Sequence, residues 1–318
     1  MEREQTIKAI SGKLRVNLIE AEKILDKAII GGEVDSDFDE WFNQRFLPNV
    51  VFINEDGYSR MCIDALKILG KTAATDYGSS RQRDLGQLWA DMTRGYLGEL
   101  AFKMFLDKNG ISAELGHEVG DISDYLPADI HRIKKLDQNW RDPNLKISIK
   151  TTKWNGIWLD IPGDQFNHSD VCVLVKVGTG RDHLFAYFKK ISVFKDKILK
   201  VGKDSGLLSQ ADADNLYDNL PTFENIPAYI CGFAEKPNLI AKDNFFCEGK
   251  SGRKNFKITK WSGKINPEFL ARVKKQNKVV GKIQFEGIGE FAHDNGYLYN
   301  SGSLNWEQRD WQLLFDKI

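Results

Sequence analysis

The strand that decides the fold is Leu145-Lys146-Ile147-Ser148-Ile149-Lys150. Apolar and polar residues alternate strictly along it, which is the period of a β-strand with one face in a core. The leucine and the two isoleucines share one face, so Ser148 and Lys150 lie together on the other. We therefore expect a hydroxyl and an ammonium group side by side on one strand.

A glutamate precedes this strand, on a helix expected over residues 81–108. Gly95 and Gly98 lower the helix propensity by roughly 1 kcal/mol each relative to alanine, but they would let the helix approach a sheet closely. Glu99 lies beside an apolar stripe, so we expect it at the edge of the core. The stripe consists of Leu85, Leu88, Trp89, Met92, Tyr96, Leu100 and Met104.

The surrounding segments predict an α/β (α+β) fold with a mixed central sheet flanked by helices. Residues 128–133, which follow Pro127 and include Asp129, alternate weakly and predict a second strand. Residues 170–177 are almost all apolar, which predicts a central strand covered on both faces. Further strands are expected at 156–161 and 184–188, the latter after a hairpin turn at 178–181, and helices at 5–30, 58–72 and 267–275.

Three regions are expected along the chain. Residues 1–80 form an N-terminal helical region, residues 81–220 form the core that contains the alternating strand, and residues 221–318 form a β-rich C-terminal region. The acidic segment 33–40 fits the N-terminus of a helix, where carboxylates are favourable.

The net charge of zero conceals an asymmetry. Residues 1–130 carry 15 Lys/Arg and 23 Asp/Glu, whereas residues 242–282 carry 12 and 3. A basic block of this kind fits a surface that faces a polyanion, and the alternative is a solvated lysine-rich face. No run of about 18 apolar residues predicts a membrane span. The four cysteines form no metal-type pair and are expected to be reduced thiols in a cytoplasmic protein.

Two carboxylates and a lysine can hydrolyse a phosphodiester with the help of a hard cation. Mg²⁺ takes one or two carboxylates, with waters and phosphate oxygens completing its coordination. Glu99 and Asp129 are the expected metal ligands. Lys150 can orient the attacking water and stabilise developing negative charge. The sequence therefore predicts Mg²⁺-assisted cleavage of a phosphodiester.

Glu99, Asp129 and Lys150, in this order, resemble the pattern of the PD-(D/E)XK nuclease superfamily, which includes most type II restriction endonucleases. The resemblance covers residues 94–177, about a quarter of the chain. It implies a mixed sheet flanked by helices and Mg²⁺-dependent cleavage of DNA. It also implies that Asp129 bridges the metal and that Lys150 is the motif lysine.

The chain departs from the family pattern at two positions. An alanine, Ala128, separates Pro127 from Asp129, and Ser148 occupies the position of a second carboxylate. Some members of the superfamily keep a serine there and take the acid from a helix. Glu99 is our first choice for that acid, followed by Asp164 and then Asp160. Gln165 resembles a glutamine that follows the motif lysine in exonuclease-like members.

Two clusters are candidates for contact with DNA. Lys153, Trp154 and Asn155 directly follow the motif strand and combine a phosphate-binding cation with a side-chain amide. The alternative for this cluster is a plain turn. Arg253, Lys254 and Asn255 in the basic block carry the side-chain types that read guanine and adenine.

The expected activity is that of a type II restriction enzyme, a Mg²⁺-dependent, site-specific double-strand DNA endonuclease. A homodimer is expected because cutting both strands of a symmetric site requires two active sites. No glycine-rich phosphate loop occurs, so no nucleotide cofactor is expected. The alternatives are a structure-specific repair or recombination nuclease, an inactive DNA-binding protein on a nuclease core, and a protein-interaction module.

Overall fold

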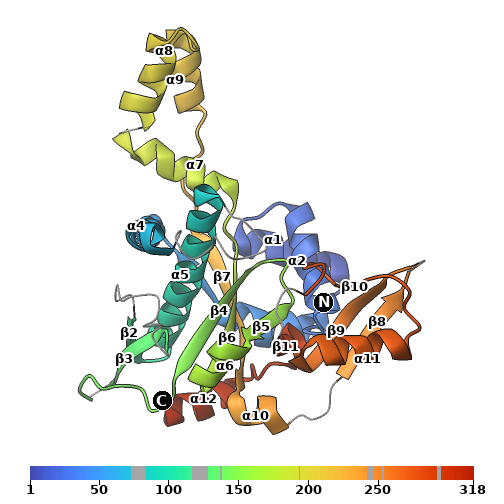
Figure 1. The fold of residues 1–318 in the computed structure, drawn as a ribbon. Helices are drawn as coiled ribbons and strands as arrows, with labels where there is room; N and C mark the ends of the chain where they lie inside the picture. The colour runs from blue at the N-terminus through green and yellow to red at the C-terminus, as the bar shows by residue number, and fades with distance from the viewer. Residues whose placement is uncertain are drawn as a thin grey trace.

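The computed structural model describes residues 1–72, 84–116, 128–136, 138–192, 194–241, 246–252, 254–291 and 295–318. Within these ranges the chain is a mixed α/β protein, as predicted, with helices packed on both faces of a central sheet (Figure 1). No described helix is both long enough and apolar enough to cross a membrane.

The central sheet has four strands in the order β1-β7-β6-β4. β4 and β6 run parallel, while β7 is antiparallel to both β6 and β1. Every residue of β6 is buried, which confirms the prediction of a central strand covered on both faces. The sheet takes strands from all three expected regions: β1 (Val50–Ile53), β4 (Ile147–Lys153), β6 (Val171–Val177) and β7 (Ile226–Glu235).

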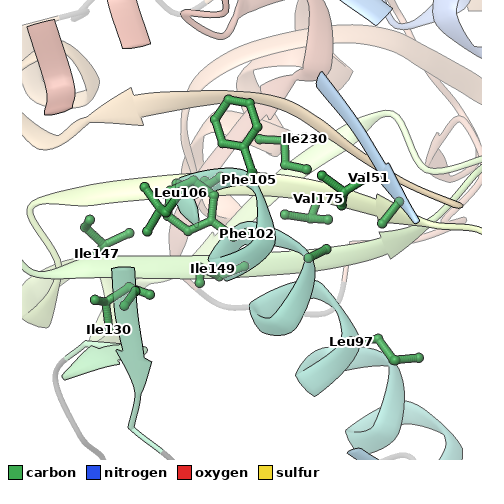
Figure 2. Close-up of a cluster of buried hydrophobic side chains, with 14 of the residues drawn as sticks. Val51, Leu97, Phe102, Phe105, Leu106, Ile130, Ile147, Ile149, Val175 and Ile230 are labelled. Atoms are coloured by element: carbon green, nitrogen blue, oxygen red, sulfur yellow. The ribbon is translucent and has the colours of Figure 1, made fainter. Parts of the chain in front are cut away.

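The two faces of this sheet bury separate apolar clusters. Helix α5 (Leu85–Lys108) packs on one face with its C-terminal half (Figure 2). Helices α1 (Arg3–Leu14) and α2 (Leu18–Ile30) contribute to the cluster on the other face. Figure 2 labels ten residues of the first cluster: Val51, Leu97, Phe102, Phe105, Leu106, Ile130, Ile147, Ile149, Val175 and Ile230.

A second sheet, in the order β10-β9-β11-β5 with β8 paired to β9, lies beside the first. It covers a third apolar cluster around the fully buried ring of Trp261. A separate hairpin pairs β2 with β3. The strands are β2 (Ile111–Leu115), β3 (Ile130–Lys135), β5 (Trp158–Pro162), β8 (Phe246–Ser251), β9 (Phe256–Ile265), β10 (Ile283–Phe285) and β11 (Gly296–Asn300).

The remaining helices connect these sheets, and α8 and α9 project from the body of the molecule (Figure 1). Asp37 caps α3 by accepting hydrogen bonds from the backbone N–H groups of Asp39 and Glu40, as expected for the acidic segment. The helices are α3 (Phe38–Glu40), η1 (Trp41–Phe46), η2 (Leu47–Asn49), α4 (Glu55–Thr72), α6 (Gly163–His168), α7 (Arg181–Lys190), η5 (Phe194–Leu199), α8 (Lys200–Asp204), α9 (Gln210–Asp218), α10 (Lys236–Ala241), α11 (Pro267–Gln276), η6 (Ser301–Ser303) and α12 (Gln308–Lys317).

Three local predictions were wrong. Residues 184–188 are not a strand but part of α7, and residues 178–181 lead into this helix instead of forming a hairpin turn. Short apolar runs fit either period, and the chain here follows the helical one. The helix expected over 5–30 is interrupted at Arg15, whose left-handed φ of 56° separates α1 from α2.

The apolar stripe predicted on α5 lies mostly at the edge of the buried face of the helix, and other residues form the centre of that face. Leu85 is 61% exposed, whereas Leu97, Ala101 and Phe102 are fully buried. The C-terminal half of α5 is apolar on most sides, so spacing alone did not select the buried face.

Gly98 gives α5 its close contact with β4. A Cβ atom at Gly98 would lie 1.8 Å from Oγ1 of Thr151, whereas a Cβ atom at Gly95 would have no atom within 4 Å. Thr151 Oγ1 also donates a hydrogen bond of 3.2 Å to the carbonyl oxygen of Gly95. The predicted close approach of helix and sheet therefore depends on Gly98.

A buried ion pair joins the N-terminal segment to the sheet. Nζ of Lys176 on β6 donates to Oε1 of Glu33 at 2.5 Å, and the Ser301 hydroxyl donates to the same oxygen at 2.6 Å. Burial alone would raise the pKa of Glu33, but Lys176 and Arg45 outweigh it and hold that pKa below its ordinary value. Arg45 also donates to the backbone oxygens of Cys231 and Ser301.

Replacement of the two glycines should have opposite effects on stability. Gly98→Ala forces a methyl group into Thr151, and overpacking of this kind costs about 1–3 kcal/mol. Gly95→Ala adds a methyl group in open space and gains up to about 1 kcal/mol of helix propensity. Urea denaturation of both variants measures the difference. Equal stabilities would show that α5 does not depend on its contact with β4.

Removal of Lys176 should be strongly destabilising because Glu33 would remain buried without its main partner. We expect Lys176→Met to lower the free energy of unfolding by about 3–5 kcal/mol. Adding Glu33→Gln should recover part of this loss, as a double-mutant cycle would detect. The exposed Lys134 is the control, and Lys134→Met should change stability by less than about 0.5 kcal/mol.

Candidate functional site

Asp129 is fixed on the open edge of β4. Its backbone N–H donates to the carbonyl oxygen of Ile147 at 2.9 Å, and its Oδ2 accepts the N–H of Ile149 at 2.5 Å. The Ser148 hydroxyl also hydrogen-bonds to its side chain. These contacts hold the carboxylate beside β4, the strand that carries Lys150. The other edge of β4 is paired with β6.

Glu99 joins this carboxylate from α5. The contact of Gly98 with Thr151 brings the helix onto β4 one residue before Glu99. Burial, followed by repulsion from Asp129, raises the pKa of Glu99 well above its ordinary value, and attraction to Lys150 opposes this shift. The structure therefore gathers Glu99, Asp129 and Lys150 from two elements and one loop, as the sequence predicted.

The pKa of Asp129 is also raised, chiefly by burial. The N–H of Ile149, the charge of Lys150 and the Ser148 hydroxyl act in the opposite direction. The two carboxyl groups, each negative when ionised, therefore share a site with the ammonium group of Lys150. A proton or a cation between the two carboxylates would relieve their repulsion.

Gln165 positions the lysine. Nζ of Lys150 donates a hydrogen bond to Oε1 of Gln165, which lies on α6. The sequence indicated Gln165 only through the resemblance, because no local pattern links residues 15 positions apart. On the neighbouring strand β6, the buried Cys172 pairs in register with Ser148. The Cys172 thiol contacts the Ser169 hydroxyl at 3.4 Å.

The two second-choice acids belong to β5 and α6. Asp160 is on β5 in the second sheet, where it pairs in register with Leu298. Asp164 belongs to the first turn of α6, but its side chain lies outside the described structure. The carboxylates of Glu99 and Asp129 both interact electrostatically with Lys150.

The first predicted DNA-contact cluster divides into exposed and buried parts. Lys153 and Asn155 are exposed, whereas Trp154 is only 8% exposed and packs against Phe46 with a ring separation of 6.3 Å. Trp154 is a core residue of this structure. The polar groups that this turn presents to solvent are therefore those of Lys153 and Asn155.

The second cluster lies between β8 and β9. Lys254 and Asn255 are exposed, and Arg253, like Pro127, lies outside the described residues. Oδ1 of Asn255 accepts the N–H of Lys282 at 3.0 Å, so this amide already has a structural partner.

The donor set fits the predicted Mg²⁺. Among the described residues, no group of three His, Cys, Asp or Glu side chains is placed to hold a metal ion. Mg²⁺ needs no such cage, because one or two carboxylates with waters and phosphate oxygens suffice. Glu99 and Asp129 supply two carboxylates whose mutual repulsion a cation would offset.

Comparison with known proteins adds no assignment to this geometry. No family model matches the chain, and neither a curated protein nor a solved structure matches it. The chemistry of the site must be inferred from its own residues.

Neutralising Glu99 should stabilise the metal-free protein at neutral and higher pH. A raised pKa means that the folded protein holds the proton to a higher pH than the unfolded chain does. Stability is therefore lost as pH rises from the ordinary carboxyl pKa, about 4.3, toward the raised value. In EDTA, Glu99→Gln should melt above the wild type at pH 8 and close to it near pH 4.

Mg²⁺ should reverse this order, because a cation held by the two ionised carboxylates of the wild type would stabilise the folded protein by mass action. Thermal melting of both proteins with and without Mg²⁺ measures the effect. The exposed Glu114 supplies the control, Glu114→Gln. A wild type that is more stable than Glu99→Gln in EDTA at pH 8 would contradict the expected burial of an unfavourable charge.

Proposed function

We propose that the chain is a Mg²⁺-dependent, site-specific double-strand DNA endonuclease of the type II restriction class. The observation that carries this proposal is the convergence of Glu99, Asp129 and Lys150 at the open edge of β4. Two partly buried acids next to one lysine suit metal-assisted hydrolysis of a phosphodiester. The resemblance noted in the sequence supports DNA as the substrate.

Each residue has a distinct role in the proposed reaction. Asp129 and Glu99 would hold Mg²⁺, which when bound supplies charge stabilisation at the phosphate and a more acidic water. Lys150 orients the attacking water and stabilises negative charge on the phosphate oxygens. Gln165 fixes the lysine Nζ, and Ser148 fixes the Asp129 carboxylate.

Ser148 favours a second candidate, a DNA-binding protein that has lost catalysis. Its hydroxyl occupies the position where the family pattern has an acid. Glu99 argues for the active enzyme, because it brings a second carboxylate to Asp129 from the helix. A structure-specific repair nuclease would share this site, and preferential cleavage of branched or flapped DNA over plain duplex would identify it.

We also propose a homodimer that binds duplex DNA through its basic surfaces. Lys153, Lys254 and Lys257 are exposed, and the β8–β9 hairpin carries the last two. A symmetric recognition site read by two copies would place one active site on each strand.

Lys150→Ala should abolish cleavage without unfolding the protein. We expect unmethylated phage DNA to give discrete fragments with the wild type and Mg²⁺, and none in EDTA. Lys150→Ala, and equally Asp129→Asn, should lower the rate by at least about 100-fold, the contribution typical of a catalytic acid–base or charge-stabilising group.

Lys134→Ala removes an exposed lysine of β3 and serves as the matched control. It should cut at the wild-type rate. Fragments that persist with Lys150→Ala would place the active site elsewhere. Salt-dependent binding to DNA without cleavage in any metal would favour the inactive alternative.

A further inference from the structure

A cavity of about 660 Å³ lies at one end of the central sheet, where β4 and β6 end. Helices α4, α5 and α7 line it together with the ends of β4 and β6, and the three helices gather there in Figure 1. Its volume is in the range of small-molecule sites. It shares α5 with Glu99 and β4 with Lys150, but neither of these two residues lines it.

The lining of this cavity combines aromatic rings with positive charge. Tyr58, Trp89 and Phe188 contribute rings, and Arg94 and Lys153 contribute cations, with Arg181 a third cation at the lining. The described lining residues include no carboxylate, but two of the cations are paired just outside the lining, Arg94 with Asp91 at 3.0 Å and Arg181 with Asp182 at 3.6 Å. A ligand that satisfies this lining is flat and apolar at one end and anionic at the other.

Three polar atoms of residues at the cavity lack a hydrogen-bond partner within the described structure. They are Oγ1 of Thr93, Nε of Arg94 and Oγ1 of Thr179, and all three are buried. Buried polar groups are nearly always hydrogen-bonded, so each such atom calls for an explanation. The three residues line the cavity with other atoms, and these three atoms are not themselves exposed to it.

Lys153 and Thr179 mark one end of the cavity. They also line a second cavity of about 400 Å³, on the α2 side of the sheet, so they lie between the two. Lys153 is exposed, three residues beyond Lys150 on the same strand, which corresponds to about 10 Å. Arg94 precedes Glu99 by five residues, about 7.5 Å along α5. Because side chains alternate along a strand, Lys150 and Lys153 leave β4 on opposite faces, and Lys153 lies on the cavity side.

We propose that the cavity receives a nucleobase turned out of a bound DNA strand, with the adjoining phosphate held by Lys153 and Thr179. This assignment rests on the proposed nuclease function. The base would stack on Trp89, whose ring is held in place by a 2.9 Å hydrogen bond from Nε1 to the backbone oxygen of Cys62. Enzymes that read or modify an extruded base use aromatic and apolar pockets in this way.

Photo-crosslinking in EDTA tests the proposal without cleavage. The probe is a short single-stranded oligonucleotide that carries 5-iododeoxyuridine, and mass spectrometry locates the adduct. We expect the adduct on the peptides of Trp89 or Tyr58. Crosslinks confined to other parts of the chain would overturn the proposal.

Equilibrium binding of the same oligonucleotide supplies the second measurement. Trp89→Ala should weaken binding about tenfold, within the range for loss of one base–aromatic stack, whereas Trp89→Phe should retain most of the affinity. Lys153→Ala should weaken binding by a similar factor, and Lys134→Ala should not. If Trp89→Ala does not fold, unchanged affinity in Lys153→Ala and Arg181→Ala, both exposed positions, would overturn the proposal.

Two further arms separate the possible outcomes. Deoxyadenosine monophosphate that displaces the probe as readily as unlabelled oligonucleotide would identify a free nucleotide as the ligand and overturn the assignment to a DNA strand. Wild-type cleavage with unaltered binding by the Trp89 and Lys153 variants would refute the base pocket alone. Crosslinking at Trp89 without any Mg²⁺-dependent cleavage would refute the nuclease alone.

Discussion

The contact between Gly98 and Thr151 is the constraint on which the site depends. It brings α5 so close to β4 that no side chain fits between them at this point. Glu99, the next residue, is thereby held near a carboxylate that the edge of β4 fixes through its own backbone.

The protein contains two buried clusters of charged side chains, and the ratio of positive to negative groups differs between them. Around Glu33, two cations and a hydroxyl surround a single carboxylate, and its pKa is lowered. At the site, two carboxylates face a single lysine, and both of their pKa values are raised. The first arrangement stabilises the fold, whereas the second has an excess of negative charge. An excess of this kind is typical of positions where binding, and not folding, completes the set of interactions.

The sequence predicted those features that depend on local periodicity. The alternation that begins at Leu145 indicated β4, and the apolar run over 170–177 indicated β6. The shared site of Glu99, Asp129 and Lys150 was inferred from their order together with the resemblance, and not from periodicity. The pairing of β1 with β7 joins residues more than 170 positions apart, and no local pattern encodes it. The partnership of Glu33 with Lys176 was missed for the same reason, because a lysine inside an apolar strand gives no sign of its distant partner. The placement of 184–188 failed for a different reason, since five apolar and aromatic residues fit both periods.

The path of the chain through the central sheet limits how the protein can be divided. β1 lies on one outer edge of this sheet and pairs only with β7, and Arg45 connects the segment before β1 to backbone oxygens at Cys231 and Ser301. A fragment that comprised residues 81–220 would contain the acids and the lysine but would lack half of the strands that support them. The group formed by Glu99, Asp129 and Lys150 is therefore not a transplantable module. Limited proteolysis of the folded protein should release loops and termini in preference to an autonomous piece. Chimaeras made by exchanging the C-terminal third would lose β7 and so disturb the central sheet.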